Sequence, residues 1–339
     1  MNLIGPVRYQ GKFGFLDFEG NWAIEPRFEK LGEMREGMAA FLAGGKVGFI
    51  DERGNVVIEP RFDCSERIGL SMGFSERLSV VELDGSAGYV DRTGRFVIPP
   101  RKGVQLWDFV GDKAFGCSDE NGYHVIDRNG GIISRFNVYE VPFIMGFPKN
   151  WDCFTCWASY GEDGFLAAAL NWKGETVIPA IFARLGEFHQ GTASFCLREE
   201  DAFDGPWGLV KLSGGVLVPP RFYSVRDFQE GLAPAALVRK QFGFINIEGE
   251  FLIPPIYHQA CPFSEGLACV TVPGAGTLNK GFINTRGELV IEPRYRRQTS
   301  FRNGFAEVEF EDKVGYIDTT GRIIWQRPRE LDARHRLKM

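Results

Sequence analysis

Two neighbouring stretches, Gly48-Phe49-Ile50-Asp51-Glu52-Arg53-Gly54 and Val57-Ile58-Glu59-Pro60-Arg61-Phe62, recur in altered form along the whole chain. The aromatic and β-branched residues on both sides of the turn favour strands. Asp51 can accept backbone hydrogen bonds at the first turn position, and Gly54 tolerates a positive φ. Pro60 cannot donate a ladder hydrogen bond, so it marks a strand end or an edge. The stretch therefore predicts a β-hairpin.

The turn itself occurs nine times, with its glycines 34 to 44 residues apart. Similarity at such a period indicates a repeat protein, in which each unit packs mainly against its neighbours. The nine turns are Asp17 to Gly20, Asp51 to Gly54, Asp91 to Gly94, Asp127 to Gly130, Asn171 to Gly174, Lys211 to Gly214, Asn246 to Gly249, Asn284 to Gly287 and Asp318 to Gly321.

A third element, Phe-x-x-Gly-x-Ala, follows several of the hairpins, as in Phe228 to Ala233 and Phe263 to Ala268. It predicts a turn that leads into another strand. Each unit then holds about three short antiparallel strands, and the extended link between units could form a fourth. Because sustained helical periodicity is missing, we expect an all-β protein.

These motifs together resemble the WG repeat family, which is widespread in bacteria. The resemblance extends over roughly residues 3 to 325, although the Trp-Gly pair of the family name occurs only at Trp207-Gly208. Elsewhere the Trp position holds Phe13, Val47, Ala87, Phe242 or Val314, so we interpret it as a packing position. The resemblance implies tandem β units and a binding or scaffold role, and it implies no catalytic residues.

The size of the units favours a propeller-like toroid of about nine units, with a β-solenoid as the alternative. A rod needs polar capping units at its ends, and neither end of the repeat region shows one. We expect a single repeat domain over residues 1–325, with irregular units at about 102–182. Residues 326–339 are rich in basic residues, and we expect a flexible tail that could attract an acidic partner.

The irregular units supply the candidate binding residues. His124 stands where most copies have glycine, and Trp151, Trp157 and Tyr160 lie in a segment without a recognisable third motif. Aromatic side chains on irregular loops are typical anchors of binding surfaces. The alternative is that they fill a gap in irregular packing. Together with Trp107, these aromatic residues could also stack on sugar rings.

The sequence offers little catalytic chemistry. Cys153 and Cys156 form the one Cys-x-x-Cys pair, a weak metal or redox candidate because a structural zinc site needs two more ligands. The other five cysteines, Cys64, Cys117, Cys196, Cys261 and Cys269, are scattered. The recurring turn aspartates are explained by their turn position, although two carboxylates brought together by folding could still hydrolyse glycosides. We expect no cofactor, no bound metal and no enzymatic activity.

Composition narrows the choice of partners. The net charge of −5 does not favour nucleic acid or an anionic membrane surface. No apolar run approaches the roughly 18 residues of a membrane span. Residues 1–6 lack the cationic start and apolar run of a secretion signal, and seven cysteines suit reduced thiols, so we expect a cytoplasmic protein.

These observations predict a non-enzymatic protein–protein interaction scaffold that binds an unidentified protein through its loops and irregular central units. The alternative is a propeller that binds or processes carbohydrate. Neutralisation of a toxin encoded nearby is a third possibility that genomic context would reveal.

Overall fold

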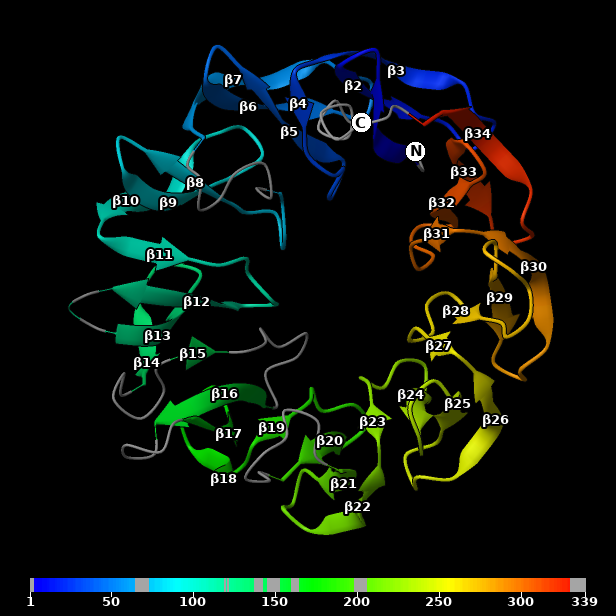
Figure 1. The fold of residues 1–339 in the computed structure, drawn as a ribbon. Helices are drawn as coiled ribbons and strands as arrows, with labels where there is room; N and C mark the ends of the chain where they lie inside the picture. Colours follow the sequence, from blue (N-terminus) through cyan, green and yellow to red (C-terminus); the bar gives the residue numbers. More distant parts are fainter. Residues whose placement is uncertain are drawn as a thin grey trace, which may run out of the picture. The chain divides into compact units, whose positions relative to one another are not determined.

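The computed structural model describes residues 3–64, 73–118, 120, 122–136, 143–144, 153–159, 165–197 and 206–329 (Figure 1). These residues form strands and turns and contain no helix, so the all-β prediction is confirmed. The strands form nine small antiparallel sheets, and within each sheet they follow one another in sequence order. This is the meander of a β-propeller blade, and we number the sheets 1 to 9 along the chain.

The first four sheets have these strands. Sheet 1 contains β1 (Ile4–Tyr9), β2 (Lys12–Leu16) and β3 (Trp22–Phe28). Sheet 2 contains β4 (Lys30–Leu31), β5 (Met38–Ala43), β6 (Lys46–Asp51) and β7 (Val56–Asp63). Sheet 3 contains β8 (Ser79–Leu83), β9 (Ser86–Val90) and β10 (Phe96–Lys102). Sheet 4 contains β11 (Val104–Leu106), β12 (Lys113–Ser118), β13 (Gly122–Asp127) and β14 (Ile132–Arg135).

The remaining five sheets are four-stranded. Sheet 5 contains β15 (Phe143–Ile144), β16 (Phe154–Ser159), β17 (Phe165–Leu170) and β18 (Thr176–Phe182). Sheet 6 contains β19 (Arg184–Leu185), β20 (Thr192–Cys196), β21 (Trp207–Lys211) and β22 (Val216–Phe222). Sheet 7 contains β23 (Ser224–Val225), β24 (Ala233–Ala236), β25 (Phe242–Ile245) and β26 (Phe251–Tyr257). Sheet 8 contains β27 (Gln259–Ala260), β28 (Leu267–Thr271), β29 (Lys280–Asn284) and β30 (Leu289–Tyr295). Sheet 9 contains β31 (Arg297–Gln298), β32 (Phe305–Phe310), β33 (Lys313–Asp318) and β34 (Ile323–Pro328).

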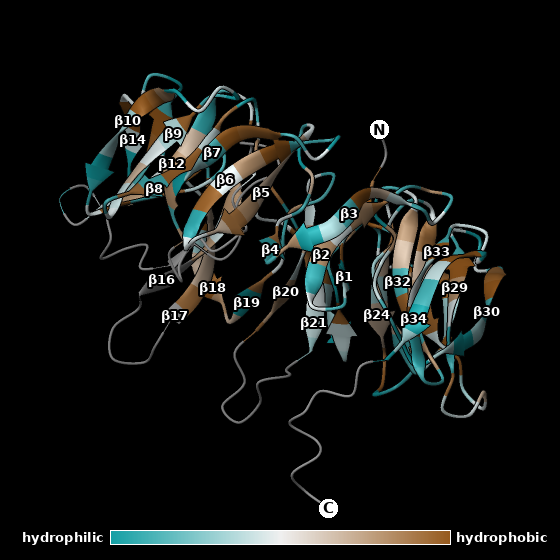
Figure 2. Cartoon of the chain, turned by 90° about the horizontal axis from the view of Figure 1, so that it is seen from above, coloured by the Kyte–Doolittle hydropathy of each residue, from teal (hydrophilic) through white to brown (hydrophobic). Residues whose placement is uncertain are grey.

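In the seven four-stranded sheets, the extended link between repeat units forms the predicted fourth strand. In sheet 2 it is the two-residue strand β4, which pairs with β5. The next two strands are buried on both faces over much of their length, because each sheet packs between its neighbours. The last strand, β7, buries Ile58 and Phe62 and leaves Val56 and Val57 exposed. Figure 2 shows hydrophobic residues gathered on the strands and hydrophilic residues in the turns between them.

The recurring turn is closed by its first residue. Asp51 Oδ1 accepts the backbone N–H of Arg53 at 2.9 Å and that of Asn55 at 2.8 Å. Gly54 has a φ of +82°, as its motif position requires. Asn171 Oδ1 makes the same two bonds, at 3.0 Å each, to Lys173 and Glu175. The turn aspartates therefore act as backbone acceptors, a role that an uncharged amide fills equally well.

This equivalence predicts different outcomes for two substitutions of Asp51. Replacing Asp51 by Ala leaves two backbone N–H groups without their side-chain acceptor and should lower the free energy of unfolding by about 1 kcal/mol. Asp51→Asn should cost much less, because Asn keeps the accepting oxygen. Urea denaturation of both variants measures the difference. Equal losses would mean that the charge, and not the hydrogen bonding, stabilises the turn.

A second glycine of the motif is required by close packing. A Cβ on Gly48 would lie 2.5 Å from the carbonyl oxygen of Ile58 and 2.8 Å from the nitrogen of Pro60. The ladder between β6 and β7 shifts register at this point, so the later strand crosses directly over the glycine. The glycine before the aromatic residue therefore lets the outer strand approach its neighbour.

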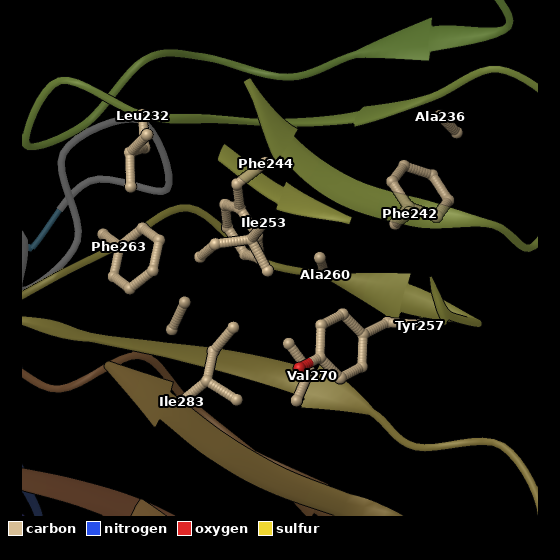
Figure 3. Packing of buried hydrophobic residues seen from close by; sticks show 11 residues of the cluster. Leu232, Ala236, Phe242, Phe244, Ile253, Tyr257, Ala260, Phe263, Val270 and Ile283 are labelled. Carbon is tan, nitrogen blue, oxygen red and sulfur yellow. The ribbon is translucent and has the colours of Figure 1, made fainter. Parts of the chain in front are cut away.

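Hydrophobic clusters join successive sheets. One cluster combines Phe242, Phe244 and Ile253 of sheet 7 with Val270 and Ile283 of sheet 8 (Figure 3). The position that holds Trp in the repeat family also packs into such clusters. Its occupants Phe13, Val47, Trp207 and Phe242 each belong to a cluster or pack against one, which agrees with the interpretation of a packing position.

Arginine side chains add a polar link between neighbouring sheets. Arg27 donates from Nη2 to the carbonyl oxygen of Gly54 in the next sheet at 2.6 Å, and its guanidinium lies 5.0 Å from the ring centre of Phe28. Arg61, Arg221 and Arg294 make the same contact with Gly94, Gly249 and Gly321. At the equivalent position of sheet 7, Ile256 has 56% of its surface exposed.

Contacts divide the chain into two compact units. One comprises Met1–Gly164 and Ala169–Thr176, and the other comprises Phe165–Ala168 and Val177–Met339. In the described residues, no helix is long and apolar enough to cross a membrane. The last strand ends at Pro328, where Lys313 is its ladder partner.

Candidate functional site

Of the three aromatic candidates in the irregular segment, only Trp157 lies among the residues that the structure describes. Trp151 and Tyr160 lie outside the described residues. The backbone of Trp157 belongs to β16 and pairs with Phe143 of β15. A binding role for these three residues stays a prediction.

Trp107 is partly buried in the link that follows β11. Its carbonyl oxygen accepts a 2.6 Å hydrogen bond from the hydroxyl of Tyr89, whose pKa is raised by burial. Its ring lies 6.3 Å from that of Tyr123, tilted by 39°. These contacts place Trp107 in the packing between sheets 3 and 4 and leave it only partly available to stack on a sugar.

His124 lies in the interior of the first unit, with 3% of its surface exposed. Its Nδ1 lies 2.9 Å from the carbonyl oxygen of Gly122, and burial lowers its pKa, so the ring is neutral and carries its proton on Nδ1. Together with Ala87, Ile98 and Ser118, among others, it lines a cavity of about 50 Å³. Such a volume suits water and not a sugar.

The two cysteines of the Cys-x-x-Cys pair are both buried, and burial raises the pKa of Cys156 to about 12. A thiol with such a pKa is a poor nucleophile and metal ligand at neutral pH. Over the described part of the chain, no group of three His, Cys, Asp or Glu side chains could hold a metal ion.

A more open site forms where two kinds of turn meet at one end of the sheets. In sheet 2, Met38 pairs with Asp51, so the turn before β5 and the turn after β6 lie at the same end. Ser79 pairs with Val90 in sheet 3, and Lys113 pairs with Asp127 in sheet 4, with the same consequence. Five charged side chains from these turns line a cleft of about 590 Å³, which we call the basic cleft: Glu36, Glu76, Arg77, Arg92 and Arg128.

The two carboxylates of the basic cleft accept hydrogen bonds from backbone amides. Glu36 accepts the N–H groups of Glu76 at 2.8 Å and Arg77 at 2.9 Å, one with each oxygen. Glu76 in turn accepts the N–H of Gly111 in the next sheet at 3.2 Å. Glu230 and Glu265 make the same kind of bond in the second unit, so this carboxylate-to-amide chain is a general device that links neighbouring turns.

The arginines of the basic cleft form fewer hydrogen bonds and ion pairs than its carboxylates. Arg128 donates to the carbonyl oxygens of Glu76 at 2.8 Å and Gly111 at 3.3 Å, and it lies 3.8 Å from the Glu76 carboxylate. Arg77 and Arg92 are exposed, and among the described residues neither forms an ion pair. Three guanidinium groups therefore face two carboxylates that already accept backbone hydrogen bonds. Lys113 and, more weakly, Arg128 lower the pKa of the Asp112 carboxyl, so a third carboxylate lies near these guanidinium groups.

Arg77 has a positive φ at a position where other copies of the repeat have glycine. Its φ is +67°, whereas the equivalent Gly37, Gly231 and Gly266 have φ values of +74°, +81° and +77°. A non-glycine side chain in this region costs on the order of 1 kcal/mol. Sequence reasoning did not single out this residue, although the missing glycine in Phe74-Ser75-Glu76-Arg77 was a readable signal.

Arg92 and Arg128 share the second position of the recurring turn in two successive sheets. In the second unit the same position holds Leu212, Ile247, Thr285 and Thr319. The positive charge of the basic cleft is thus specific to sheets 3 and 4 and is no general property of the repeat.

Comparison with protein families identifies the repeat. The family described as "WG containing repeat" matches residues 13–46, 48–63, 88–101, 207–237, 242–272 and 281–313. The resemblance that the sequence motifs suggested is therefore confirmed. No curated protein matches the chain.

Solved structures share the fold at low sequence identity. A crystal structure of a eukaryotic initiation factor matches with a TM-score of 0.61 and 11% identity, over 95% of this chain and 94% of that chain. BamB from Moraxella catarrhalis matches with a TM-score of 0.39 and 10% identity, over 83% and 88% of the two chains. At such identity the first similarity shows the fold alone.

Proposed function

Because this chain carries WG-containing repeats in six segments between residues 13 and 313, we propose that it is a non-enzymatic binding scaffold whose basic cleft takes an acidic segment of another protein. The observation that carries the proposal is Arg77, a strained arginine at a position that tolerates glycine without cost. A residue that lowers stability is retained most readily when its side chain serves binding.

The chemistry of the basic cleft suits carboxylates. Guanidinium groups form planar, paired hydrogen bonds with carboxylates, and exposed arginines lose less hydration than lysines when they do so. Arg77 and Arg92 have no ion pair among the described residues, so both are available. The net charge of −5 opposes a long polyanion such as nucleic acid, which would meet acidic surface beyond the cleft.

The carbohydrate alternative has less support. It relies on exposed aromatic faces, and Trp107 is partly buried against Tyr123. Trp151 and Tyr160 lie outside the described residues, so the carbohydrate role stays a prediction from sequence.

The test uses a fluorescent twelve-residue peptide of alternating Glu and Gly, and the same peptide with Gln in place of Glu. Arg77→Gly restores the glycine of the repeat, and it is combined with Arg92→Ala. The matched control combines Arg53→Ala with Arg286→Ala, two exposed arginines outside the cleft, and removes the same charge.

The acidic peptide should bind the unaltered protein at low salt, and the Gln peptide should not. The cleft variant should lose about tenfold or more in affinity, because two guanidinium contacts disappear. The control should stay within about twofold. Equal losses in both variants would reduce the effect to net charge, and absence of binding to the unaltered protein would contradict the proposal.

A further inference from the structure

Two cysteines that are separate in the sequence face each other in sheet 8. The register of β27 and β28 pairs Ala260 with Val270, and the next pair toward the turn is Cys261 and Cys269. The N–H of Cys261 donates to the carbonyl oxygen of Cys269 at 2.9 Å, which confirms direct opposition. Opposed residues of an antiparallel pair project to the same face, with Cα atoms about 5.5 Å apart or closer, within the range of a disulfide.

The equivalent pair in other sheets shows how closely these side chains approach. In sheet 6 it is Gly186 and Ser194, joined by the same backbone bond at 2.8 Å. A Cβ on Gly186 would lie 2.6 Å from Ser194 Oγ, so side chains at these two positions point directly at each other. In sheet 2 the pair is Gly32 and Ala40, again with a 2.8 Å backbone bond. In sheet 8 the same arrangement places the side chains of Cys261 and Cys269 opposite each other.

The surroundings of the two sulfurs differ. Cys269 is buried, with 5% of its surface exposed, and the side chain of Gln298 in sheet 9 donates to its sulfur. Cys261 is only partly buried, which leaves it open to a small reagent. The hydrogen bond from Cys269, with the nearby charges of Arg226 and Lys280, lowers the pKa of the Cys261 thiol although burial opposes this. Of the two sulfurs, that of Cys261 is therefore better placed to attack a small reagent, and that of Cys269 is buried beside it.

We propose that Cys261 and Cys269 form a reversible redox pair that a small hydroperoxide oxidises to an intramolecular disulfide. The Cys261 thiolate attacks a peroxide oxygen, the O–O bond breaks, and Cys261 becomes a sulfenic acid while the peroxide's other oxygen leaves as water or an alcohol. The sulfur of Cys269 then attacks the sulfur of Cys261. The S–O bond breaks, and the hydroxyl leaves as water with the proton from Cys269.

In total, the two reaction steps convert two thiols and one peroxide into one disulfide and two waters, or one water and one alcohol. Two electrons pass from sulfur to oxygen. Reduction by a dithiol reverses it by thiol–disulfide exchange. The inference does not depend on the basic cleft, which lies in the other unit of the chain.

The experiment treats the reduced full-length protein with one equivalent of hydrogen peroxide, blocks free thiols with an alkylating reagent, and digests with trypsin. Both cysteines fall in the single fragment 241–280, because residues 241 to 279 contain no Lys or Arg. The fragment should escape alkylation and be about 2 Da lighter than its reduced form. Cys64 and Cys117, both partly buried, should stay alkylated and serve as internal controls.

Two variants test whether the sulfenic acid on Cys261 forms before the disulfide. Cys269→Ser should stop at the sulfenic acid, which dimedone traps on Cys261, and Cys261→Ser should leave Cys269 in the thiol form. Ser and Ala occur at the position of Cys269 in sheets 6 and 2, so Cys269→Ser and Cys269→Ala both use residues that the fold already accepts. Full alkylation of the fragment at a peroxide dose that oxidises other cysteines would overturn the proposal. Oxidation no faster in the native chain than in urea-unfolded chain would overturn it also.

Discussion

Gly243→Ala should lower the free energy of unfolding by about 3 kcal/mol or more, because the added methyl group would clash with backbone atoms. A Cβ on Gly243 would lie 2.3 Å from the carbonyl oxygen of Ile253 and 2.7 Å from the nitrogen of Pro255. Both are backbone atoms of the neighbouring strand β26, so no side-chain rotation relieves the clash. The strand must move away, and its ladder with β25 must loosen.

The control for this substitution is Gly215→Ala in the same unit. A Cβ on Gly215 meets no atom within 4 Å, and its backbone does not lie in the left-handed region. Its effect should fall within about 0.5 kcal/mol of zero. Urea denaturation followed by tryptophan fluorescence measures both variants. A loss of less than about 1 kcal/mol in Gly243→Ala would show that the outer strand can yield at little cost.

The second large effect concerns Gly116 and His124, which are ladder partners in sheet 4. In other sheets the large residue and the glycine are exchanged, as in Val81 opposite Gly88 and Phe41 opposite Gly48. In sheet 4 the imidazole occupies the space, and a Cβ on Gly116 would lie 2.4 Å from His124 Nε2. Gly116→Val should therefore destabilise the protein by about 3 kcal/mol.

A second substitution should relieve this clash. His124→Gly alone removes a buried ring and should cost about 2 to 4 kcal/mol through the cavity that it leaves. The double variant recreates the Val–Gly pair of sheet 3, so it should be more stable than the sum of the single effects predicts by about 2 kcal/mol or more. A double-mutant cycle by urea denaturation measures this coupling. Additive effects would mean that the two side chains do not compete for one space.

In sheet 4 the large residue and the glycine have exchanged strands, and this explains what the sequence could and could not reveal at His124. The departure from glycine was visible, and it suggested a binding residue. The compensating Gly116 was not recognisable, because its relation to His124 depends on strand register. Aligning the strand before each Gly-aromatic pair would have found it, since Phe41 and Val81 occupy the same place.

Local interactions account for what the sequence determined by itself. The turn, its acceptor residue and the glycine with positive φ are satisfied within five residues, as at Asp51, Gly54 and Asn55, so their repetition was sufficient to predict hairpins and an all-β fold. The short fourth strand was also foreseeable, because the link after each Pro-x-aromatic motif is extended and lies beside the next strand.

Tertiary structure alone decided which distant residues meet. Arg77, Arg92 and Arg128 come from three turns over 52 residues, and they share a cleft because successive sheets present the same turns at the same end. Cys261 and Cys269 seemed scattered, and they are opposed because a tight turn between them sets the register. Strand register and the stacking of sheets depend on burial summed over many side chains, so no short motif records them.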